Sequence, residues 1–600
     1  MTLPLFGDLA GTALLAALPV VVVALVIGLV GFHVGARAPA ASDRDQLRFN
    51  VAAIVIALVV GFVFVKRQAS VFDDAFISFR YANNWLRGDG LVFNSGERVE
   101  GITNLLWTVG VAVGTWLTGV ELPLVALVGD VLAYVGCVVA TAWLSRWNAL
   151  QRGGAWGFAL APCLVALQYR MTASATTGLE TGPVALTVVA AAVGLAVGSG
   201  RGRVIAGGLL LAGTLMHPDL ALAWVAGVVA TAACVPSDRR VRSVVEFAAT
   251  LPLFAAATAW RVAYYGDLLP NTYYAKSANV PYYAQGIAYA GSFFVGSHLW
   301  VALGLAAMGA FLVVRRRDWT ILHLFFGLFL LAKSAYVIRL GGDFMDGRLF
   351  VDLLPPLLLL AEDAARRAPV HLQAWLLAAL LATVRGTCLL PPGQIVGFLA
   401  DENSFYPLVS LSPVTVQHGC SREGVLLHQI FVERGLQPVI TSGGIGQLAY
   451  YSDLPLIDIH GLTDAVVAHG PTPSRRGHPG HEKWPSRSYL EERQVRFARS
   501  ERLCSGPHAA QMRVRFRGVK SGTWCLFVYD RALMADIAAR APEVAFVDFP
   551  AWLDRYIVDL PQKDPETVAA DWVWFQEYYF NANDDPFRRA AFTRFLEAQP

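Results

Sequence analysis

The sequence predicts a polytopic α-helical membrane protein that ends in a soluble α/β domain. Three observations lead to this fold class: an apolar composition, repeated apolar runs of membrane-spanning length, and a polar final third. Of the 600 residues, 55% are hydrophobic and only 16% are charged, and the mean hydropathy is +0.47. An ordinary globular domain carries about 25% charged residues, so most of this chain needs an apolar solvent. The formal net charge of +3 is too small to indicate a nucleic-acid partner.

The apolar runs divide residues 1–391 into about eleven to thirteen predicted spans, because about 20 helical residues cross a bilayer core. They lie near residues 11–33, 49–65, 122–145, 155–168, 182–199, 203–216, 219–235, 243–264, 291–314, 319–339, 347–367 and 371–390. The first run has no basic segment before it and no small-residue cleavage site after it, which predicts a retained anchor rather than a signal peptide. The run 103–118 carries Asn104, Trp107 and Trp116, which favours a helix along the membrane surface.

Arginines predict which way the spans run. Alternate connections are basic, and they hold Arg37, Arg44 and Arg48, then Arg146 and Arg152, Arg201 and Arg203, Arg239, Arg240 and Arg242, Arg315, Arg316 and Arg317, and finally Arg366 and Arg367. The positive-inside rule assigns all of them to the cytoplasm. The other connections, at 66–121, 169–181, 216–219, 265–290 and 338–347, then share the outer face with the C-terminal region.

Residues 392–600 form the predicted extracytoplasmic domain, which is large enough for a core of its own. The segment from Val439 to Asp458 reads as a strand, a glycine turn, a short helix and a second strand, which predicts an α/β arrangement. Its glycines lack the full dinucleotide fingerprint, so we expect no nucleotide. If the region is extracytoplasmic, two of its three cysteines can form a disulfide, and the sequence leaves the pair open among Cys420, Cys504 and Cys525.

Two further clusters of this region favour a structural interpretation. The histidines are irregularly spaced among glycine and proline, which is typical of a solvated loop rather than a metal site; they are His460, His469, His478 and His481. The aromatic residues near the end fit a buried helix face or an interfacial anchor better than a sugar-stacking surface; they are Trp572, Trp574, Tyr578 and Tyr579.

The outer connections concentrate carboxylates, amides and aromatic residues, and they hold the candidate site. Asp73 and Asp74 follow a span by about eight residues, which places them near the water boundary, where a carboxylate can accept a proton from a sugar hydroxyl. On its own the pair fits first-turn acids of a helix better. The remaining candidates would bind an anionic headgroup or a polar substrate: Arg80, Glu100, Asn104, Glu180, His217, Asn271, Lys276, Arg339, Asp343 and Arg348. The cations among them also fit snorkelling side chains or internal ion pairs.

Five outer segments form a set: Asp73-Asp-Ala-Phe-Ile-Ser-Phe-Arg-Tyr-Ala, Val99-Glu-Gly-Ile-Thr-Asn-Leu-Leu-Trp107, Thr177-Gly-Leu-Glu180-Thr, Leu269-Pro-Asn-Thr-Tyr-Tyr-Ala-Lys276 and Gly341-Gly-Asp-Phe-Met345. The set resembles the outer-loop motifs of glycosyltransferase superfamily C (GT-C), and within it the terminal β-(1→2)-arabinofuranosyltransferases of mycobacteria. The resemblance extends to Gly443–Ser452 and Asp458–Asp464 in the C-terminal region. It is specific for the superfamily and less specific for the sugar.

The resemblance implies a GT-C membrane transferase with its site on the periplasmic face of a bacterial cytoplasmic membrane. The donor would be decaprenyl-phosphoryl-β-D-arabinofuranose, and the acceptor the non-reducing end of arabinan in arabinogalactan or lipoarabinomannan. It implies Asp73 or Asp74 as the base, and no metal or other cofactor, because a lipid monophosphate is already a fair leaving group. A β donor and a β product mean net retention, which leaves open a covalent carboxylate intermediate or attack from the leaving-group face.

Two alternatives to this function are another polyprenyl-phosphate-sugar-dependent GT-C transferase and, in a different class, a flippase for a lipid-linked glycan. A non-enzymatic scaffold is a third class, but it would not need polar sequences in five separate outer connections. A transporter places ionisable groups at mid-bilayer and often contains inverted repeats. Here the acids and bases gather in the outer connections, and the main exceptions lie in the outer halves of their spans: Asp130, Arg261, Lys333 and Asp352. This distribution favours the enzyme.

Overall fold

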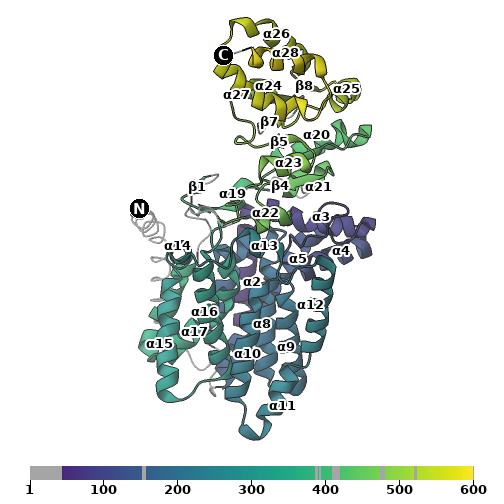
Figure 1. Cartoon of the computed structure of the whole chain (residues 1–600). Coiled ribbons are helices and arrows are strands. Elements are labelled where there is room, and N and C mark those ends of the chain that lie inside the picture. The colour runs from purple at the N-terminus through teal and green to yellow at the C-terminus, as the bar shows by residue number, and fades with distance from the viewer. Residues whose placement is uncertain are drawn as a thin grey trace.

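The computed structural model describes residues 43–151, 157–384, 390, 394–408, 419–472, 480–518 and 523–598. A bundle of helices carries a smaller domain with a β-sheet on one of its ends (Figure 1). The predicted anchor at 11–33 lies outside the described residues, as do Arg37, Arg152 and His478.

The bundle consists of apolar helices that follow the predicted runs. Its helices are α2 (Asp43–Gln68), α5 (Leu122–Gln151), α6 (Leu160–Leu167), α7 (Tyr169–Ala173), α8 (Thr181–Val197), α9 (Gly200–Thr214), α10 (Ala221–Cys234), α11 (Ser237–Phe247), α12 (Leu251–Tyr265), α14 (Tyr283–Gly296), α15 (Trp300–Arg316), α16 (Ile321–Leu340), α17 (Leu354–Arg367) and α18 (Val370–Leu380). One apolar core runs through the bundle, from Ile54 in α2 to Leu380 in α18.

The number of spans differs from the prediction. Among the described residues, four helices are long and apolar enough to cross a membrane: Arg44–Gln68, Leu122–Gln151, Ser237–Tyr265 and Ile321–Leu340. Two bent pairs, Tyr169–Thr176 with Thr181–Val197 and Tyr283–Gly296 with Trp300–Arg316, raise the number to six if each pair is one span. The other predicted spans fall on shorter helices, such as α9 with 15 residues and α10 with 14. An apolar run shows which residues avoid water, but it does not fix where the helix begins and ends.

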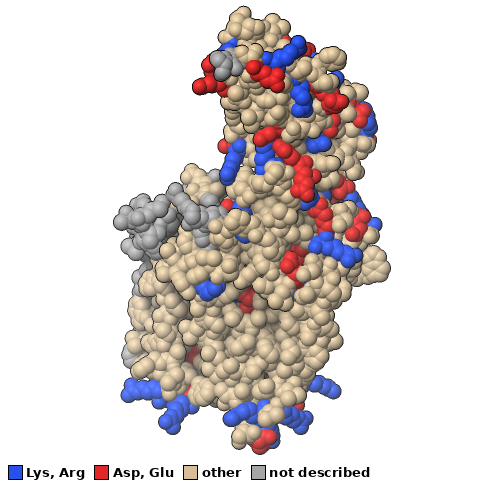
Figure 2. Space-filling model, viewed as in Figure 1, with Lys and Arg blue, Asp and Glu red and all other residues tan. Residues whose placement is uncertain are grey.

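On the face that Figure 2 shows, few charged side chains interrupt the middle of the bundle. Figure 2 shows Lys and Arg gathered at the end away from the sheet domain, where Figure 1 places α11. This helix carries Arg239, Arg240 and Arg242. Along the bundle, large apolar side chains such as Leu253 and Leu331 face outward, each 73% exposed. Exposed apolar side chains without charges are what a lipid-facing surface requires. The chain is therefore a multi-pass membrane protein.

Shorter elements cover the end of the bundle that carries the sheet domain. They are α3 (Asp73–Arg87), α4 (Leu105–Thr118), η1 (Ser174–Thr176), η2 (Pro218–Leu220), α13 (Asn271–Ala275), η3 (Arg348–Leu353), β1 (Ile395–Val396), β2 (Leu399–Ala400) and α19 (Glu402–Phe405). The short element η4 (Leu381–Thr383) directly follows α18 in the bundle. Helix α4 matches the predicted surface helix at 103–118, and Figure 1 places it beside α3 at the junction with the sheet domain. That it lies along a membrane surface stays a prediction.

The C-terminal domain is built on a six-stranded mixed sheet in the order β4-β3-β5-β7-β6-β8. Strand β3 pairs in parallel with β4 and β5, and the other neighbours are antiparallel. The elements are α20 (Gly419–Ile430), η5 (Val432–Arg434), β3 (Val439–Ser442), α21 (Gly446–Ser452), β4 (Leu456–Asp458), α22 (Ala465–His469), α23 (Arg487–Glu492), β5 (Val495–Arg499), α24 (Ala509–Met512), β6 (Arg513–Phe516), β7 (Trp524–Leu526), α25 (Arg531–Arg540), β8 (Val544–Phe546), α26 (Phe549–Val558), η6 (Leu560–Gln562), α27 (Pro565–Phe575), η7 (Gln576–Phe580) and α28 (Pro586–Glu597).

Local predictions for this domain are confirmed. The predicted strand, glycine turn, helix and strand are β3, the turn at 443–445, α21 and β4. A disulfide joins Cys504 to Cys525, which settles the pair that the sequence left open, and Cys420 is a free thiol. The aromatic residues near the end belong to the apolar core of the domain, and Tyr578 and Tyr579 are fully buried there.

The first outer connection packs directly into the sheet domain. Tyr81 and Phe93 belong to the same apolar core as Leu456 and Ile457 of β4. On the other side of α3, the ring of Phe76 contacts Tyr450 at a centroid distance of 5.4 Å. These contacts hold the sheet domain over the outer connections of the bundle, where the candidate site lies.

Candidate active site

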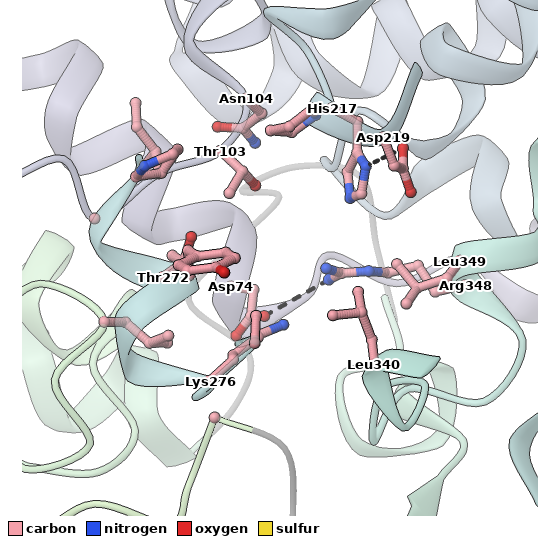
Figure 3. Close-up of a pocket in the computed structure, with 18 of the residues that line it drawn as sticks. Asp74, Thr103, Asn104, His217, Asp219, Thr272, Lys276, Leu340, Arg348 and Leu349 are labelled. Carbon is pink, nitrogen blue, oxygen red and sulfur yellow. Dashed lines mark hydrogen bonds and ion pairs between the residues drawn. The ribbon is translucent and has the colours of Figure 1, made fainter. Parts of the chain in front are cut away.

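A cavity of about 300 Å³ lies where the outer connections meet the sheet domain (Figure 3). All five of the outer connections predicted from the arginine pattern contribute to its walls. The sheet domain closes it with Leu462, Gly480 and His481. Six of the predicted site residues line it: Asp74, Asn104, Glu180, His217, Lys276 and Arg348.

One wall combines Asp74 with two cations, Lys276 and Arg348. Asp343, another predicted residue, does not line the cavity but lies buried behind these cations. An Arg348 guanidinium nitrogen lies 3.7 Å from the Asp74 carboxylate and another lies 3.4 Å from Asp343. Lys276 Nζ lies 3.9 Å from the other oxygen of Asp343. Burial alone would raise the pKa of Asp343, but Lys276 and Arg348 outweigh it and hold that pKa below its ordinary value. Asp343 therefore stays charged and anchors both cations at the cavity.

Asp74 has a different balance of neighbours. Its side chain is half-buried at the cavity wall, and burial raises its pKa above the ordinary value. Arg348 and Lys276 oppose this rise, while the negative charges of Asp343 and Asp73 add to it. A carboxylate whose pKa is raised toward neutrality is a better general base than an ordinary surface aspartate.

The opposite wall is a chain of hydrogen bonds between polar side chains. Ser78 donates to Asn104 Oδ1 at 2.9 Å, and Asn104 Nδ2 donates to Glu180 at 2.7 Å. Beside them, His217 Nδ1 lies 2.6 Å from Asp219 Oδ1. Figure 3 shows Asn104, His217 and Asp219 across the cavity from Asp74 and Lys276. The cavity therefore offers polar groups for a sugar on one side and cations for an anion on the other.

Asp73 and Arg80 do not line this cavity. The Asp73 carboxylate accepts backbone N–H bonds from Gly446 at 3.0 Å and Gln447 at 2.8 Å, so it caps the start of α21 in the sheet domain. Arg80 donates to the carbonyl oxygens of Phe93 at 2.7 Å and Leu454 at 2.9 Å. Both side chains connect α3 to the sheet domain. The sequence could not distinguish a structural role for Asp73 and Arg80 from a catalytic or substrate-binding role, because both residues belong to the motif that also contains Asp74.

Three other predicted residues also lie off the cavity. Glu100 forms an ion pair with Arg261, and the Asn271 amide donates to the carbonyl oxygens of Gly461 at 2.7 Å and Leu462 at 3.0 Å. Arg339 donates to the carbonyl oxygens of Ala278 at 3.2 Å and Asn279 at 3.3 Å. These contacts hold the outer connections together. The partners of Arg339 are carbonyl oxygens rather than the carboxylates of the internal ion pair that was the alternative interpretation.

The sequence reasoning missed several residues of the walls. Thr272 and Tyr273 line the cavity, and they stand inside the motif that supplied Asn271 and Lys276. His481 also lines it, with its ring 5.1 Å from Phe344 and 4.7 Å from His460. The prediction of a solvated loop is wrong for these two histidines, which are half-buried. Irregular spacing in a glycine-rich segment carried no information on tertiary contacts.

Glu402 is a further missed residue, and no motif marked it. It lies in α19, where Asn403 ties the segment to Gln68 at 3.0 Å and Ser70 at 2.8 Å. Together with Arg348 it lines a smaller cavity of about 40 Å³. Burial raises the pKa of Glu402 to about 8, and the charges of Asp74, Asp73 and Asp343 add to the rise. Glu402 is therefore a protonated acid beside the charged wall at neutral pH.

Within the part of the chain that the structure describes, no group of three or more His, Cys, Asp or Glu side chains could hold a metal ion. The cavity can instead bind an anion through Arg348 and Lys276, and it holds a carboxylate that can accept a proton. Its volume suits a small ligand group such as a sugar with its phosphate.

No protein-family model matches the chain. Over 325 residues it is 31% identical to a terminal β-(1→2)-arabinofuranosyltransferase of Mycobacterium tuberculosis, an alignment that covers 48% of this chain and 50% of that protein. It is also 31% identical over 335 residues to the protein of the same description from Corynebacterium glutamicum, with 47% of each covered. The chain thus spans about half the length of the curated relatives it matches. These matches confirm the resemblance predicted from the motifs.

A solved structure confirms the predicted fold class. ArnT from Cupriavidus metallidurans, bound to undecaprenyl phosphate, superposes with a TM-score of 0.51 at 13% identity, covering 80% of this chain and 98% of that one. At this identity the likeness concerns the fold alone. The chain therefore has the GT-C fold, in which a helical membrane bundle is followed here by a sheet domain.

Proposed function

We propose that this protein is a membrane glycosyltransferase that moves a sugar from a polyprenyl-phosphate donor to a glycan acceptor. The observation that carries the proposal is the charged wall of the cavity, where Asp74 lies 3.7 Å from Arg348 and Lys276 shares Asp343 with that arginine. The phosphodiester of such a donor needs cationic hydrogen-bond donors at headgroup depth, and an attacking hydroxyl needs a base. In this cavity, the cationic donors and the candidate base lie on the same wall.

The reaction assigns a role to each of these groups. Arg348 and Lys276 bind the donor phosphate and stabilise the charge that develops on its bridging oxygen. The bond between the anomeric carbon and that oxygen breaks, and the acceptor hydroxyl oxygen forms the new glycosidic bond. Asp74 takes the hydroxyl proton, and the polyprenyl phosphate leaves as an anion. Ser78, Asn104 and Glu180 then bind the sugar hydroxyls from the opposite wall.

For the sugar we propose arabinofuranose, from decaprenyl-phosphoryl-β-D-arabinofuranose to the non-reducing ends of cell-wall arabinan, through β-(1→2) links. This finer proposal is supported by the 31% identity to two terminal arabinofuranosyltransferases and by the outer-loop motifs that carry the cavity residues. The acceptor arabinan would belong to arabinogalactan or lipoarabinomannan. Retention at the anomeric carbon then requires either a transient carboxylate adduct or attack from the phosphate side, and both stay open.

For the location we propose the outer face of a bacterial cytoplasmic membrane, with residues 1–391 as the membrane domain and 392–600 as the extracytoplasmic domain. Two observations support this placement. The basic side chains gather at the end of the bundle away from the cavity (Figure 2), and the sheet domain contains the Cys504–Cys525 disulfide. Positive side chains favour the cytoplasm and disulfides favour an oxidising compartment.

The test supplies the purified protein in detergent with a panel of radiolabelled polyprenyl-phosphate sugars and a short arabinan acceptor. We expect label on the acceptor from the arabinofuranose donor, and loss of transfer when Arg348→Gln replaces the wild type. Transfer from a different sugar would keep the glycosyltransferase and overturn the arabinofuranose assignment. If no donor in the panel transfers label while the protein moves the donor lipid across proteoliposome membranes, the proposal is wrong and the protein is a flippase.

A further inference from the structure

A row of buried charges extends from the cavity into the bundle. Lys333 of α16 contacts Asp219 of η2 and lies 3.1 Å from Asp352 of η3. Asp219 in turn is 2.6 Å from His217 Nδ1. The side chains of Lys333, Asp219 and Asp352 are at most 4% exposed. Lys333 and Asp352 were two of the ionisable exceptions in the predicted spans, and the roles proposed above use neither.

Such a row is costly to maintain. Ionisable side chains in a membrane helix are rare because the charged form loses its hydration, and those that occur mark functional sites. Here two carboxylates face a single ammonium group, and His217 Nδ1 contacts one of them at 2.6 Å. Glu180 and Arg348 line the same small cavity as His217.

The row reaches the cavity through His217 and Asp219, which both line it. A small cavity of about 20 Å³ is lined by Lys333 and Asp352, and it shares Glu180, His217 and Arg348 with the main cavity. Because Asp219 holds Nδ1, the other ring nitrogen of His217 is left for a ligand. Figure 3 shows the His217 ring between Asp219 and the Arg348 guanidinium. A positively charged imidazole donates from both nitrogens, and the Asp219 carboxylate lies next to that charge.

We propose that Lys333, Asp219 and Asp352 are positioning residues that hold His217 as a third cationic donor to the donor phosphate, beside Arg348. Asp219 fixes the ring through Nδ1, and Lys333 with Asp352 fixes Asp219 in turn. His217 then donates from Nε2 to a phosphate oxygen. A carboxylate behind a histidine commonly fixes both its tautomer and its direction. This inference rests on the proposed function, since it names groups that act on the same phosphate.

A double-mutant cycle with a binding readout tests the proposal. The variants are His217→Gln, Lys333→Met and the combination, and the probe is decaprenyl phosphate, whose binding to the detergent-solubilised protein is measured alongside kcat and KM. We expect each single variant to weaken lipid-phosphate binding by about tenfold to a hundredfold. The combination should be hardly weaker than His217→Gln alone, because Lys333 acts through the histidine. Losses that multiply in the combination would overturn the proposal.

Arg261→Met is the matched control, because Arg261 is similarly buried, pairs with Glu100 and does not line the cavity. It removes a buried ion pair without touching the row, so its effect should be independent of His217→Gln. If Lys333→Met does not fold, Asp352→Asn removes the other end of the row and enters the same cycle. Full lipid-phosphate binding by a folded Asp352→Asn and by His217→Gln would also overturn the proposal.

The binding readout separates this inference from the proposed function. If the wild type binds decaprenyl phosphate but transfers no sugar, the proposed function fails while the cycle still decides the role of Lys333. A second arm replaces the lipid with inorganic phosphate. We expect competition with decaprenyl phosphate that His217→Gln weakens, because the shared chemistry is the phosphate group. Competition that His217→Gln leaves unchanged would contradict a phosphate contact by His217.

Discussion

Asp73 and Asp74 are neighbours in the chain, but the helix turns their carboxylates toward different partners. Asp73 accepts two backbone N–H bonds from α21, at 3.0 and 2.8 Å, and is 9% exposed. Asp74 lines the cavity and lies 3.7 Å from Arg348. Successive residues of a helix point about 100° apart, so a pair of adjacent acids is not a pair in space. Asp74 is therefore our candidate for the base, and Asp73 is a structural acid.

Asparagine at each position should separate the two roles. Asp74→Asn removes the proton acceptor, and we expect kcat to fall by about a hundredfold or more with little change in thermal stability. Asp73→Asn leaves one of two buried N–H donors without its charged acceptor, at a cost of about 1–3 kcal/mol. We expect that variant to melt at a lower temperature and to keep its kcat per folded molecule. The opposite pattern would return the catalytic role to Asp73.

Glu402 makes a second prediction at this scale, for the pH dependence. Its pKa is raised to about 8, chiefly by burial and then by the carboxylates of Asp74, Asp73 and Asp343. The side chain is therefore neutral below that pH and negative above it. The new negative charge opposes an anionic donor, so kcat/KM should fall as the pH rises through about 8.

Glu402→Gln removes this ionisation without changing the shape of the side chain. We expect the alkaline decline of kcat/KM to disappear, while the rate at neutral pH stays close to the wild type. Neutral and alkaline profiles of both proteins, measured with the same lipid donor, check this expectation. An alkaline decline that persists in the variant would show that another group causes it.

At the scale of elements, α3 and α21 meet so closely that only glycine fits at one position. A Cβ added to Gly446 would lie 1.7 Å from the backbone oxygen of Asp73. The contact lets the first N–H groups of α21 reach the Asp73 carboxylate. It also holds the sheet domain against α3, the helix that carries Asp74, and so helps to keep Asp74 in place at the cavity wall.

Gly446→Ala should therefore loosen the sheet domain on the bundle. Because the clash is with backbone rather than a flexible side chain, α21 must shift, and we expect faster hydrogen exchange in α3 and α21 together with reduced activity. Gly444→Ala is the control, since a Cβ there would meet only an Arg499 nitrogen at 3.9 Å. Unchanged exchange in Gly446→Ala would mean that the junction is more adaptable than this packing indicates.

The elements also show what a sequence can predict and where it fails. Periodicity and glycine placement located β3, α21 and β4, because those signals are local. The spans were harder, since α9 and α10 end after 15 and 14 residues where the apolar run continues into a turn. Arg80 and Asn271 could not be assigned, because their partners stand 374 and 190 positions away in the chain. Contacts of that kind leave no mark in the local pattern.

At the scale of the whole molecule, the two ends differ in charge and in function. Basic side chains mark one end of the bundle, and a middle section with few charged side chains follows on the face that Figure 2 shows. The cavity and the disulfide-bonded sheet domain occupy the other end. The arginine pattern predicted which connections share an end, and all five outer ones line a single cavity. The same pattern could not say which side chains would converge, because that depends on how the connections fold above the membrane.

The last prediction concerns the direction in which the molecule crosses the membrane. Ala535 in α25 and Ser237 in α11 are both exposed, so a cysteine introduced at either position can react with a thiol reagent. Serines at the cavity end of the bundle are less suitable positions, because Ser78 and Ser174 are only 3% and 6% exposed. In a Cys420→Ser background, a membrane-impermeant thiol reagent added to intact cells with a permeable outer layer should label Ala535→Cys at once. Ser237→Cys should react only after lysis, because the arginines of α11 hold that end in the cytoplasm. Labelling of Ser237→Cys in intact cells would instead place the cavity on the cytoplasmic side. The disulfide would then be reduced, and the donor lipid would have to present its sugar from the cytoplasmic leaflet, which would contradict the proposed location.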